Sequence, residues 1–388
     1  MRIGIYQNSL PTTIGGAARF QREVIRGLVD DTDSEHQFIT VSKYEPDQTV
    51  SCEHLRVPPA PALTKWADRY RRLRRRPLPA QPPLSETLRQ AGIDLLYSPS
   101  PWIPQVDVPF VVTCWDLQHR VQPYFPEVSR LGWTWDERDK HYRSTLPRAS
   151  AVVVGTQIGK TEVERFFAVD PQRIEVIPFS VPATIAECRC VRPDWAPTKP
   201  FVVYPAQFYP HKNHIRLVDA IAAIAARGDN VAAVFVGGDA QGQNGTLDYI
   251  LRAAKERGVG ERIITPGFVS DEALRWCYEN AIALVFPSLF GPDNLPPLEA
   301  LSVGCPAIVG DIPGAEEQLR DAVVRVDPFD GECFAEAIVR LAQDQRHREK
   351  LIDAGRQLTS LLTANTYASR LNRLFDRLAD TFRCWEPV

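Results

Sequence analysis

The sequence predicts an α/β protein in which helices cover parallel sheets on both faces. Short apolar, β-branched runs recur along the chain, and amphipathic helical stretches lie between most of them. Runs that are apolar on both faces and alternate with helices are typical of doubly wound parallel sheets. At 388 residues the chain is too long for one ordinary core, so we expect two or three domains.

Residues 1–181 are expected to form the first of these domains. Amphipathic stretches at 19–30 and 156–167 are expected to be helices that cover its sheet. The runs that predict its strands are RIGIY at 2–6, QFITV at 37–41, DLLYS at 94–98, FVVTC at 110–114, AVVVG at 151–155 and IEVIPF at 174–179.

Residues 182–200 interrupt this pattern with four prolines and no clear periodicity, so we interpret them as an interdomain linker. Residues 201–365 then repeat the pattern as a second domain, and a final helix within 366–388 is expected to pack back on the first. Two such domains leave a cleft between them, and their ligands bind at the carboxyl ends of the strands. The second series of strands is expected at FVVYP, 201–205, AAVFVGG, 232–238, RIITPG, 262–267, ALVFPS, 283–288, and AIVGD, 307–311.

The composition is that of a soluble globular protein, with 44% hydrophobic residues, 24% charged residues and a net charge of −3. No apolar run approaches the ~18 residues that span a bilayer, and the N-terminal run does not have the pattern of a secretory signal. The eight cysteines are scattered, and Cys188 and Cys190 form the only close pair. We therefore expect reduced thiols in a cytoplasmic protein, without a zinc site.

One segment, KWADRYRRLRRR at 65–76, is strongly basic, with seven Lys or Arg residues against one Asp. Trp66, Tyr70 and Leu73 recur at the spacing of one helix face. A basic helix with aromatic residues on its other face suits an anionic membrane surface. A solvated helix that docks on its own sheet is the alternative, and one short patch on an acidic protein gives poor support for nucleic acid. The cations that we assign to a membrane surface are Lys65, Arg69, Arg72 and Arg76.

Gly15 and Gly16 stand where the first expected strand gives way to a helix. Paired glycines there allow a ligand to approach the backbone, and the helix N-terminus favours an anion such as phosphate. A plain flexible turn is the alternative. The stretch is not G-x-G-x-x-G, which argues against a nicotinamide cofactor.

Lys212 occupies the corresponding connection of the second half, between His211 and Asn213. A lysine near a helix N-terminus opposes the helix dipole, so it is a poor choice for stability. A bound anion would resolve this conflict, with Lys212 as its counter-charge.

A single carboxylate, Glu299, follows an unusual turn in the stretch VFPSLFGPDNLPPLEALSVGCPAIVG, 285–310. Asn294 is a plausible helix N-cap, and Pro296 or Pro297 fits the first helical position. We expect Glu299 in the first turn, where it either stabilises the helix or accepts hydrogen bonds from the vicinal diol of a ribose. Exposed amides of residues 293–295 would then cradle a phosphate.

These motifs together resemble the retaining glycosyltransferases of family 4, which have the GT-B fold of two Rossmann-like domains facing a cleft. The resemblance extends from Gly15 to about Pro328 and includes CWDLQHRVQPYFP at 114–126. It implies transfer of a sugar from a GDP- or UDP-linked donor to a glycan or lipid-linked acceptor, as in cell-surface polysaccharide or glycolipid synthesis. It also implies retention at the anomeric carbon, with no metal and no cofactor. By this resemblance Glu299 holds the donor ribose, Lys212 pairs with the diphosphate and Gly16 meets the donor.

The sequence departs from the family pattern at three places. The pattern has a glutamate eight residues before Glu299, where this chain has Gly291. Asp293 is a candidate catalytic replacement, or the backbone from Asp293 through Asn294 to Leu295 holds the sugar hydroxyls alone. The usual arginine of the phosphate site is replaced by Gln207.

The third departure lies in the first-domain loop, where the usual His-Asp pair is Trp115-Asp116. His119 follows three residues later, and we assign Asp116 and His119 as candidate catalytic contacts to the acceptor or the sugar. Two other interpretations stay open: Asp116 caps the loop, and His119 is structural. Trp115 either stacks on a sugar ring or belongs to the core.

Two competing functions follow from the same residues. The missing glutamate and Gln207 leave open a catalytically silent scaffold that binds nucleotide or glycan without turnover. An NAD-dependent oxidoreductase is disfavoured, because the fingerprint glycines and the acid after the second strand are absent. The sugar and the acceptor are not encoded in any motif, and residues 267–281 are expected to select the base.

Overall fold

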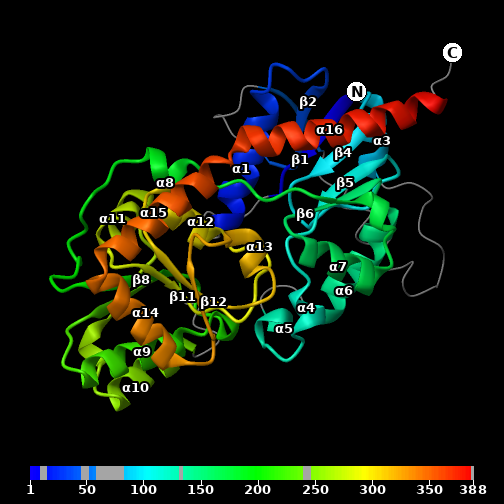
Figure 1. Cartoon of the computed structure of the whole chain (residues 1–388). Helices are drawn as coiled ribbons and strands as arrows, with labels where there is room; N and C mark the ends of the chain where they lie inside the picture. Colours follow the sequence, from blue (N-terminus) through cyan, green and yellow to red (C-terminus); the bar gives the residue numbers. More distant parts are fainter. Residues whose placement is uncertain (9–14, 45–51, 58–82, 131–133, 239–245, 386–388) are drawn as a thin grey trace.

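The computed structural model describes residues 1–8, 15–44, 52–57, 83–130, 134–238 and 246–385. It contains two parallel sheets with helices on their faces, in two domains that lie side by side (Figure 1). The predicted fold class of two doubly wound α/β domains is therefore confirmed. None of the described helices combines the length and the apolar character that a membrane span requires.

The first sheet has seven parallel strands in the order β3-β2-β1-β4-β5-β6-β7. The strand order reverses between β1 and β4, so the loops after these two strands diverge and leave a crevice at the carboxyl edge. The bounds are β1 Arg2–Tyr6, β2 Gln37–Ser42, β3 Glu53–Arg56, β4 Leu95–Ser98, β5 Phe110–Thr113, β6 Ala151–Val154 and β7 Ile174–Val176.

The second sheet has six parallel strands in the order β10-β9-β8-β11-β12-β13, and its order reverses between β8 and β11. Two short edge strands, β3 and β13, were not predicted, because EHLR and VRV carry charges in place of an apolar run. The bounds are β8 Phe201–Pro205, β9 Ala232–Val236, β10 Ile263–Gly267, β11 Leu284–Phe286, β12 Ala307–Gly310 and β13 Val324–Val326.

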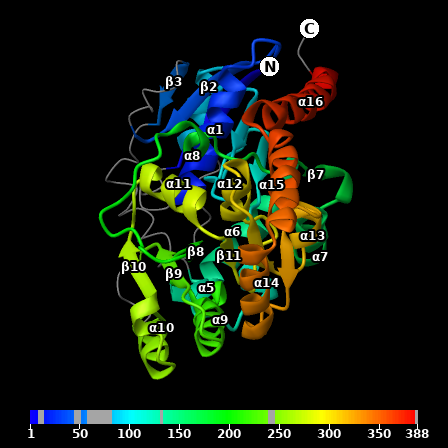
Figure 2. The same ribbon diagram turned by 60° about the vertical axis from the view of Figure 1, so that its left-hand side comes forward.

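Helices cover both sheets (Figures 1 and 2). In the first domain they are α1 Gly15–Val29, α3 Pro83–Gln90, α4 Gln118–Val121, α5 Glu127–Arg130, α6 Trp135–Thr145 and α7 Gln157–Phe167. The linker holds α8 Thr184–Glu187. The remaining helices are α9 His214–Ala226, α10 Thr246–Glu256, α11 Asp271–Asn280, α12 Leu295–Ser302, α13 Ala315–Leu319, α14 Gly331–Gln343, α15 Gln345–Ser360 and α16 Ala364–Phe382.

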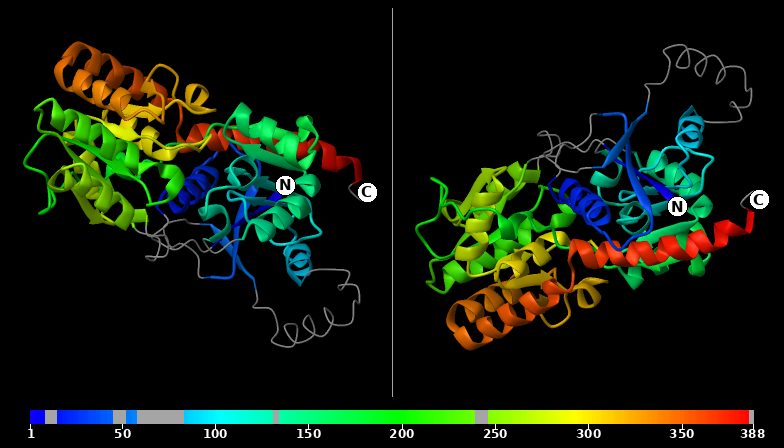
Figure 3. Two further views of the ribbon diagram at one scale, coloured as in Figure 1. Left: turned by 90° about the horizontal axis from the view of Figure 1, so that it is seen from below. Right: turned by 90° about the horizontal axis from the view of Figure 1, so that it is seen from above.

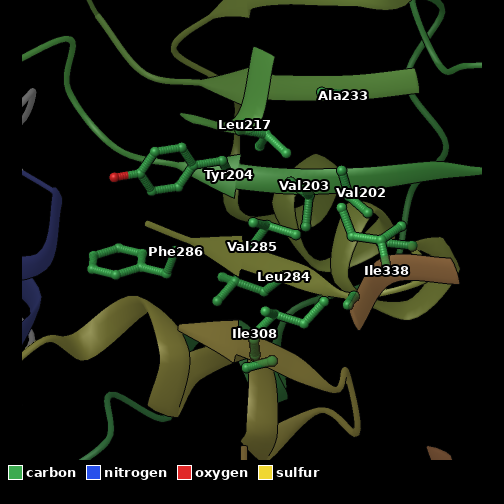
Figure 4. Packing of buried hydrophobic residues seen from close by; sticks show 14 of the residues in the cluster. Val202, Val203, Tyr204, Leu217, Ala233, Leu284, Val285, Phe286, Ile308 and Ile338 are labelled. Carbon is green, nitrogen blue, oxygen red and sulfur yellow. The ribbon is translucent and has the colours of Figure 1, made fainter. Parts of the chain in front are cut away.

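Each sheet is buried on both faces. In β4, Leu95 and Tyr97 belong to one hydrophobic cluster of the first domain and Leu96 to the other, as the alternation of side chains along a strand requires. Figure 4 shows the corresponding packing in the second domain, where side chains of β8, β11 and β12 meet Leu217 of α9 and Ile338 of α14.

The chain crosses between the domains twice, and the crossings lie side by side. The amide of Val181 donates to the carbonyl of Leu362 at 2.8 Å, which joins the start of the linker to the end of α15. After this point α16 returns to the first domain and packs along α1, as Figure 3 shows from two sides. Tyr367 and Phe375 of α16 are completely enclosed there.

Candidate functional site

The carboxyl edges of the two sheets face each other, and hydrogen bonds cross between them. The side chain of Gln122, in the loop after α4, donates to the carbonyl of Leu289 in the second domain at 2.9 Å. The amide of Gln157, at the start of α7, donates to Glu317 of α13 at 2.7 Å. Loops that follow strands of both domains therefore meet here, and we call the region between the two sheet edges the cleft.

A buried pair, Glu127 and His211, also joins the domains. Both the backbone amide and the ring of His211 donate to the Glu127 carboxylate, the amide at 3.1 Å. Burial lowers the pKa of His211 to about 4, and Lys212 beside it acts in the same direction. Burial favours a higher pKa for Glu127, but the hydrogen bonds from His211 bring it below its ordinary value. A neutral imidazole and an ionised carboxylate therefore hold this contact at neutral pH.

Lys212 lies in this cleft, at the end of a 3₁₀ turn, Pro210–Lys212, between β8 and α9. Its ammonium is 5.1 Å from the centre of the Phe286 ring. Burial lowers its pKa to about 8, although Asp116 and Glu127 act to raise it. Among the described residues, no carboxylate lies within 4.0 Å of this ammonium. A largely buried cation without an ion pair is costly, and a bound anion would offset that cost.

The Lys212 backbone is fixed from both sides. Tyr204 at the end of β8 donates its hydroxyl to the Lys212 carbonyl at 2.6 Å. Asn213 adopts the left-handed conformation, with φ of 56°, and its amide group donates to the carbonyls of Pro287 and Pro328. The bond to Pro287 joins the turn to the loop after β11. Because this loop leads into α12, it fixes the position of Lys212 relative to Glu299.

Glu299 is 3% exposed and contacts both domains. One carboxylate oxygen lies 3.4 Å from the guanidinium of Arg19 in α1, and the other lies 3.5 Å from the hydroxyl of Tyr278 in α11. Burial raises the pKa of Glu299, and the positive charge of Arg19 offsets part of this rise. The same guanidinium pairs with Asp271 at the start of α11.

The turn before Glu299 differs in detail from the prediction. Helix α12 begins at Leu295, so Glu299 falls in its second turn and Pro296 takes the second helical position. Asn294 occupies the N-cap position, but its side chain donates to the carbonyl of Gly291 at 2.7 Å instead of capping the helix. The expected first-turn position of Glu299 was therefore wrong by one or two residues, because the helix starts before the prolines.

The amide of Asn294 is not available for a phosphate in this arrangement. It donates to the side-chain oxygen of Gln318 at 3.1 Å, and the Gln318 side chain donates back to the Asn294 carbonyl at 3.1 Å. The expectation that all amides of residues 293–295 are exposed was wrong for this one, because a side chain of α13 covers it.

Gly291 and Asp293 explain the missing glutamate in steric terms. Gly291 has φ of 133°, and an added Cβ would lie 2.3 Å from the Asn294 side chain. Asp293 turns toward the first domain, where the amide of Gly155 donates to it, and a Cβ on Gly155 would lie 2.0 Å from its carboxylate. Burial, together with Glu317 and other carboxylates, raises the pKa of Asp293 well above its usual range. Asp293 is therefore placed at the domain contact.

Gly15 begins α1, and Gly16 follows it opposite the start of α12. A Cβ added to Gly16 would lie 3.7 Å from Leu295. The N-termini of α1 and α12, one from each domain, thus approach each other in the cleft and both favour a negative charge between them.

Gln207 lies in the loop after β8, and it is partly buried. This loop packs closely on the neighbouring one, because a Cβ on Gly237 would lie 2.1 Å from the carbonyl of Ala206. The amide of Phe208 donates to the carbonyl of Gly238 at 3.5 Å. The backbone around Gln207 is therefore constrained by the loop after β9.

Asp116 lies in the loop after β5, and its carboxylate accepts a hydrogen bond from the amide of Gln118 at 2.9 Å. Asp116 therefore caps the loop, which is one of the two roles considered for it from the sequence. Its charge also acts on Lys212, Glu162 and Asp293, which places the carboxylate in the cleft. Trp115 donates to the carbonyl of Pro99 at 3.1 Å and is half-buried.

His119 does not reach the cleft. Its side chain has no exposed surface, and its ring stacks on Tyr142 with centroids 5.4 Å apart. Burial lowers its pKa to about 4, so the ring is neutral. The predicted contact of His119 with a substrate is contradicted, because α4 turns the side chain into the first-domain core.

Three further features of the sequence are the basic segment, the possible metal ligands and the cysteines. The basic segment with Lys65, Arg69, Arg72 and Arg76 lies outside the described residues. The described residues contain no cluster of three or more side chains suited to a metal ion. All eight cysteines are free thiols.

A cavity of about 850 Å³ lies near the two interdomain crossings. Its lining includes the carboxylates of Glu23, Asp30, Asp31, Asp33 and Glu187. Arg26 and Arg356 also line it, but the five carboxylates outnumber these two arginines. The cavity therefore suits a diphosphate less well than the cleft around Lys212, which offers a cation and two helix N-termini. Of these two places, the cleft around Lys212 is therefore the better candidate for binding an anion.

Two family models match successive parts of the chain. A model described as "Glycosyltransferase Family 4" matches residues 14–183, and one described as "Glycosyl transferases group 1" matches residues 192–358. The chain belongs to glycosyltransferase family 4. The resemblance seen in the motifs is therefore confirmed.

Curated relatives of this family 4 chain include O-antigen mannosyltransferases. The O-antigen chain mannosyltransferase B of Escherichia coli is 26% identical over 218 residues, which cover 54% of this chain and 56% of the relative. The O-antigen chain mannosyltransferase RfbU of Salmonella typhimurium is 37% identical over 75 residues, which cover 19% of this chain and 21% of the relative. The chain therefore matches about half, or less, of the lengths of these relatives.

Solved structures show the same fold over nearly the whole family 4 chain. HepE of Anabaena, in complex with UDP and glucose, has a TM-score of 0.71 at 15% identity, with 97% of this chain and 100% of that chain covered. WaaG, a glycosyltransferase involved in lipopolysaccharide biosynthesis, has a TM-score of 0.67 at 15% identity, with coverages of 96% and 99%. These likenesses confirm the GT-B architecture.

Arg19 and Glu127 join the domains of this family 4 protein, and neither was predicted from the sequence. Arg19 lies one helical turn after Gly16, so its position on the same face of α1 was the one signal that pointed to the cleft. Glu127 had no such signal, because its partner His211 is 84 residues away.

Proposed function

We propose that this chain is a retaining hexosyltransferase that moves a sugar from a GDP- or UDP-linked donor to a glycan or lipid-linked acceptor. The observation that carries the proposal is Lys212, a largely buried cation in the cleft that lacks an ion pair among the described residues. The N-termini of α1 and α12 meet in the same cleft, and together these groups suit a diphosphate.

In the proposed reaction the second domain holds the donor. Glu299 accepts hydrogen bonds from the ribose diol, and Lys212 stabilises the departing diphosphate. A phosphate oxygen of the donor takes the acceptor proton on the face that the nucleotide leaves, so the protein mainly positions the reactants and stabilises charge. Because Lys212 and the helix N-termini supply positive charge, we propose that transfer needs no metal and no cofactor.

The proposed pathway is synthesis of a cell-surface polysaccharide or glycolipid. The O-antigen mannosyltransferases among the relatives favour this pathway and favour mannose as the sugar. We further propose that the protein works in the cytoplasm, with the basic segment at 65–76 on the inner membrane face.

The test is thermal unfolding of the full chain with UDP, GDP and other nucleoside diphosphates at saturating concentration. A ligand at ~100 times its dissociation constant stabilises the native state by about 2.7 kcal/mol, which moves the midpoint by several degrees. We expect one base to shift the transition and Lys212→Met to abolish that shift. If no diphosphate shifts the transition, the donor site is not functional and the silent scaffold becomes the better explanation.

Transfer itself is tested with the sugar donors of the base that binds. Glu299→Ala is expected to lose most of the activity, and undiminished activity would remove Glu299 from the site. Activity that is unchanged in excess EDTA is the expected result for metal independence, whereas a loss that added Mg²⁺ or Mn²⁺ restores would contradict it.

A further inference from the structure

Arg19 is the one described cation that reaches Glu299, and it comes from the opposite domain. It lies in the second turn of α1, and its guanidinium contacts both Asp271 and Glu299 of the second domain. The side chains are 18%, 29% and 3% exposed, respectively. The contact is therefore shielded from water, and Glu299 is its most buried member.

Burial raises the pKa of Glu299 and so disfavours its charged form. An isolated carboxylate in such surroundings takes up a proton rather than keep its charge. Asp271 is a like charge, so it raises the pKa of Glu299 as burial does. The Tyr278 hydroxyl opposes this, because it donates a hydrogen bond that lowers the pKa. Arg19 makes the largest opposing contribution, so the charge of Glu299 depends mainly on this residue.

The shape of the guanidinium also matters. One nitrogen of the planar group faces Asp271 and another faces Glu299, so the fork bridges α11 and α12. Lysine would supply the charge but not two fixed directions. The Tyr278 hydroxyl lies against the second oxygen of Glu299, so the carboxylate plane is defined from two sides.

We propose that Arg19 is a positioning residue for ribose recognition: from the first domain, it keeps Glu299 of the second domain ionised and oriented toward the ribose diol. This inference rests on the proposed function, in which Glu299 binds the donor ribose. It adds that the first domain takes part in recognising the nucleoside.

Domain separation would then weaken ribose binding. When α1 moves away from α12, the Arg19 guanidinium leaves Glu299, and the buried carboxylate loses its main counter-charge. The ribose site is thus complete only when the domains are as close as they are here. A donor that binds through its ribose favours this closed arrangement by the same free energy.

The alternative is that Arg19 is a clamp between domains with no effect on the ribose site. A clamp would lower the affinity for every nucleotide equally. A positioning residue lowers the affinity for nucleotides that present the full diol more than for those that lack one of its hydroxyls.

The experiment compares UDP and GDP with their 2′-deoxy forms by titration calorimetry on the full chain. The variants are Arg19→Met, Arg19→Lys and the control Arg26→Met, which removes an exposed arginine from the same helix. Each hydrogen bond to a charged group is worth roughly tenfold to a hundredfold in affinity. We expect the wild type to prefer the ribonucleotide by about tenfold or more, on that basis.

In Arg19→Met we expect this preference to fall to about twofold or less, because the diol loses its charged acceptor. Arg19→Lys should fall between Arg19→Met and the wild type, and Arg26→Met should match the wild type. An unchanged preference in Arg19→Met, or an equal loss for both nucleotides, would overturn the inference. If Arg19→Met does not fold, as judged by its unfolding midpoint, Arg19→Lys decides by the same ratio.

A pH series gives a second readout. Without Arg19, burial and Asp271 raise the pKa of Glu299 further, so the preference of Arg19→Met for the ribonucleotide over its 2′-deoxy form should fall as pH decreases within the range in which the protein is folded. The effect of Lys212 on the diphosphate is common to both nucleotides and cancels in this ratio. The wild type should change less over this range. Parallel profiles would count against the inference. Absence of nucleotide binding to the wild type would instead reject the proposed function, so the two failures are distinguishable.

Discussion

Gly291 shows how one residue's backbone conformation determines which side chains a site can hold. Its φ of 133° lies in the region that L side chains rarely adopt, and the Asn294 side chain fills the space beside it. The family glutamate at this position is therefore replaced by a turn whose parts fit only glycine. The sequence comparison alone suggests a lost function, whereas the structure shows a rebuilt turn.

Introducing the family glutamate at position 291 should therefore destabilise the protein. We expect Gly291→Glu to lower the free energy of unfolding by about 1–3 kcal/mol, the usual cost of a strained backbone, and not to raise transferase activity. Gly258→Glu is the comparison, because Gly258 also has a positive φ, 72°, but open space around its Cβ position, so it shares the backbone strain and lacks the contact with Asn294. Urea unfolding of both variants measures the difference. A Gly291→Glu protein that is as stable as the wild type and more active would contradict this account.

Lys212 should make nucleotide binding dependent on pH. Its pKa in the free protein is lowered to about 8, mainly by burial. A bound diphosphate raises this pKa, so binding is strongest below pH 8 and weakens as pH rises above it, with proton uptake. Titration calorimetry at pH 8.5 in buffers of different ionisation enthalpy measures that uptake. It should disappear in Lys212→Met, and equal uptake in the variant would assign the proton to another group.

At the scale of elements, α9 begins with a histidine that is held in its neutral form. His214 is buried, and its ring lies 4.4 Å from that of Tyr204 and 4.7 Å from that of Phe208, between centroids. Burial, with Lys212 and His211 as smaller causes, lowers its pKa to about 3. Protonation of His214 at acidic pH should therefore destabilise the folded protein.

The direction of this pH effect follows from the pKa of His214 in the folded and in the unfolded chain. The unfolded chain binds a proton on His214 near pH 6.5, whereas the folded chain binds it only near pH 3. Its contribution to stability is thus complete above pH 6.5 and is lost as pH falls. We expect His214→Phe to reduce the slope of stability against pH between 6 and 4 by up to about 1.4 kcal/mol per pH unit. Urea unfolding at several pH values measures the slope, with His347→Phe on α15 as control; equal slopes in wild type and His214→Phe would refute the assignment.

Elements were more predictable from the sequence than the contacts between them. Apolar runs marked the central strands, because those strands are buried on both faces, but β3 and β13 lie at edges and carry charges. The motif order placed Lys212 and Glu299 in the cleft. His119 was misplaced, because its distance of three residues from Asp116 does not show that α4 turns it inward. Contacts such as Arg19 with Glu299 span 280 residues and leave no local pattern.

At the scale of the whole molecule, the first domain is not a continuous piece of the chain. Helix α16 closes its core after the second domain has been completed, and Phe375 lies between rings of β2 and β4. The last part of the chain is therefore required before the first domain can bury its apolar surface. The two side-by-side crossings, joined through Val181 and Leu362, also limit how the domains move relative to each other.

Phe375→Ala tests this dependence. Truncation of a buried phenylalanine costs about 3–5 kcal/mol, because it removes buried surface and leaves a cavity. Phe375 has no exposed surface, and its ring centre lies 5.7 Å from that of Tyr97 in β4 and 6.4 Å from that of Phe38 in β2. We expect the variant to unfold at a lower temperature and limited proteolysis to cut the first domain before the second. Phe329→Ala, which truncates a 65% exposed ring of the second domain, should behave as the wild type. If Phe375→Ala instead exposes the second domain first, α16 contributes to the fold through its link to α15 and not through the core of the first domain.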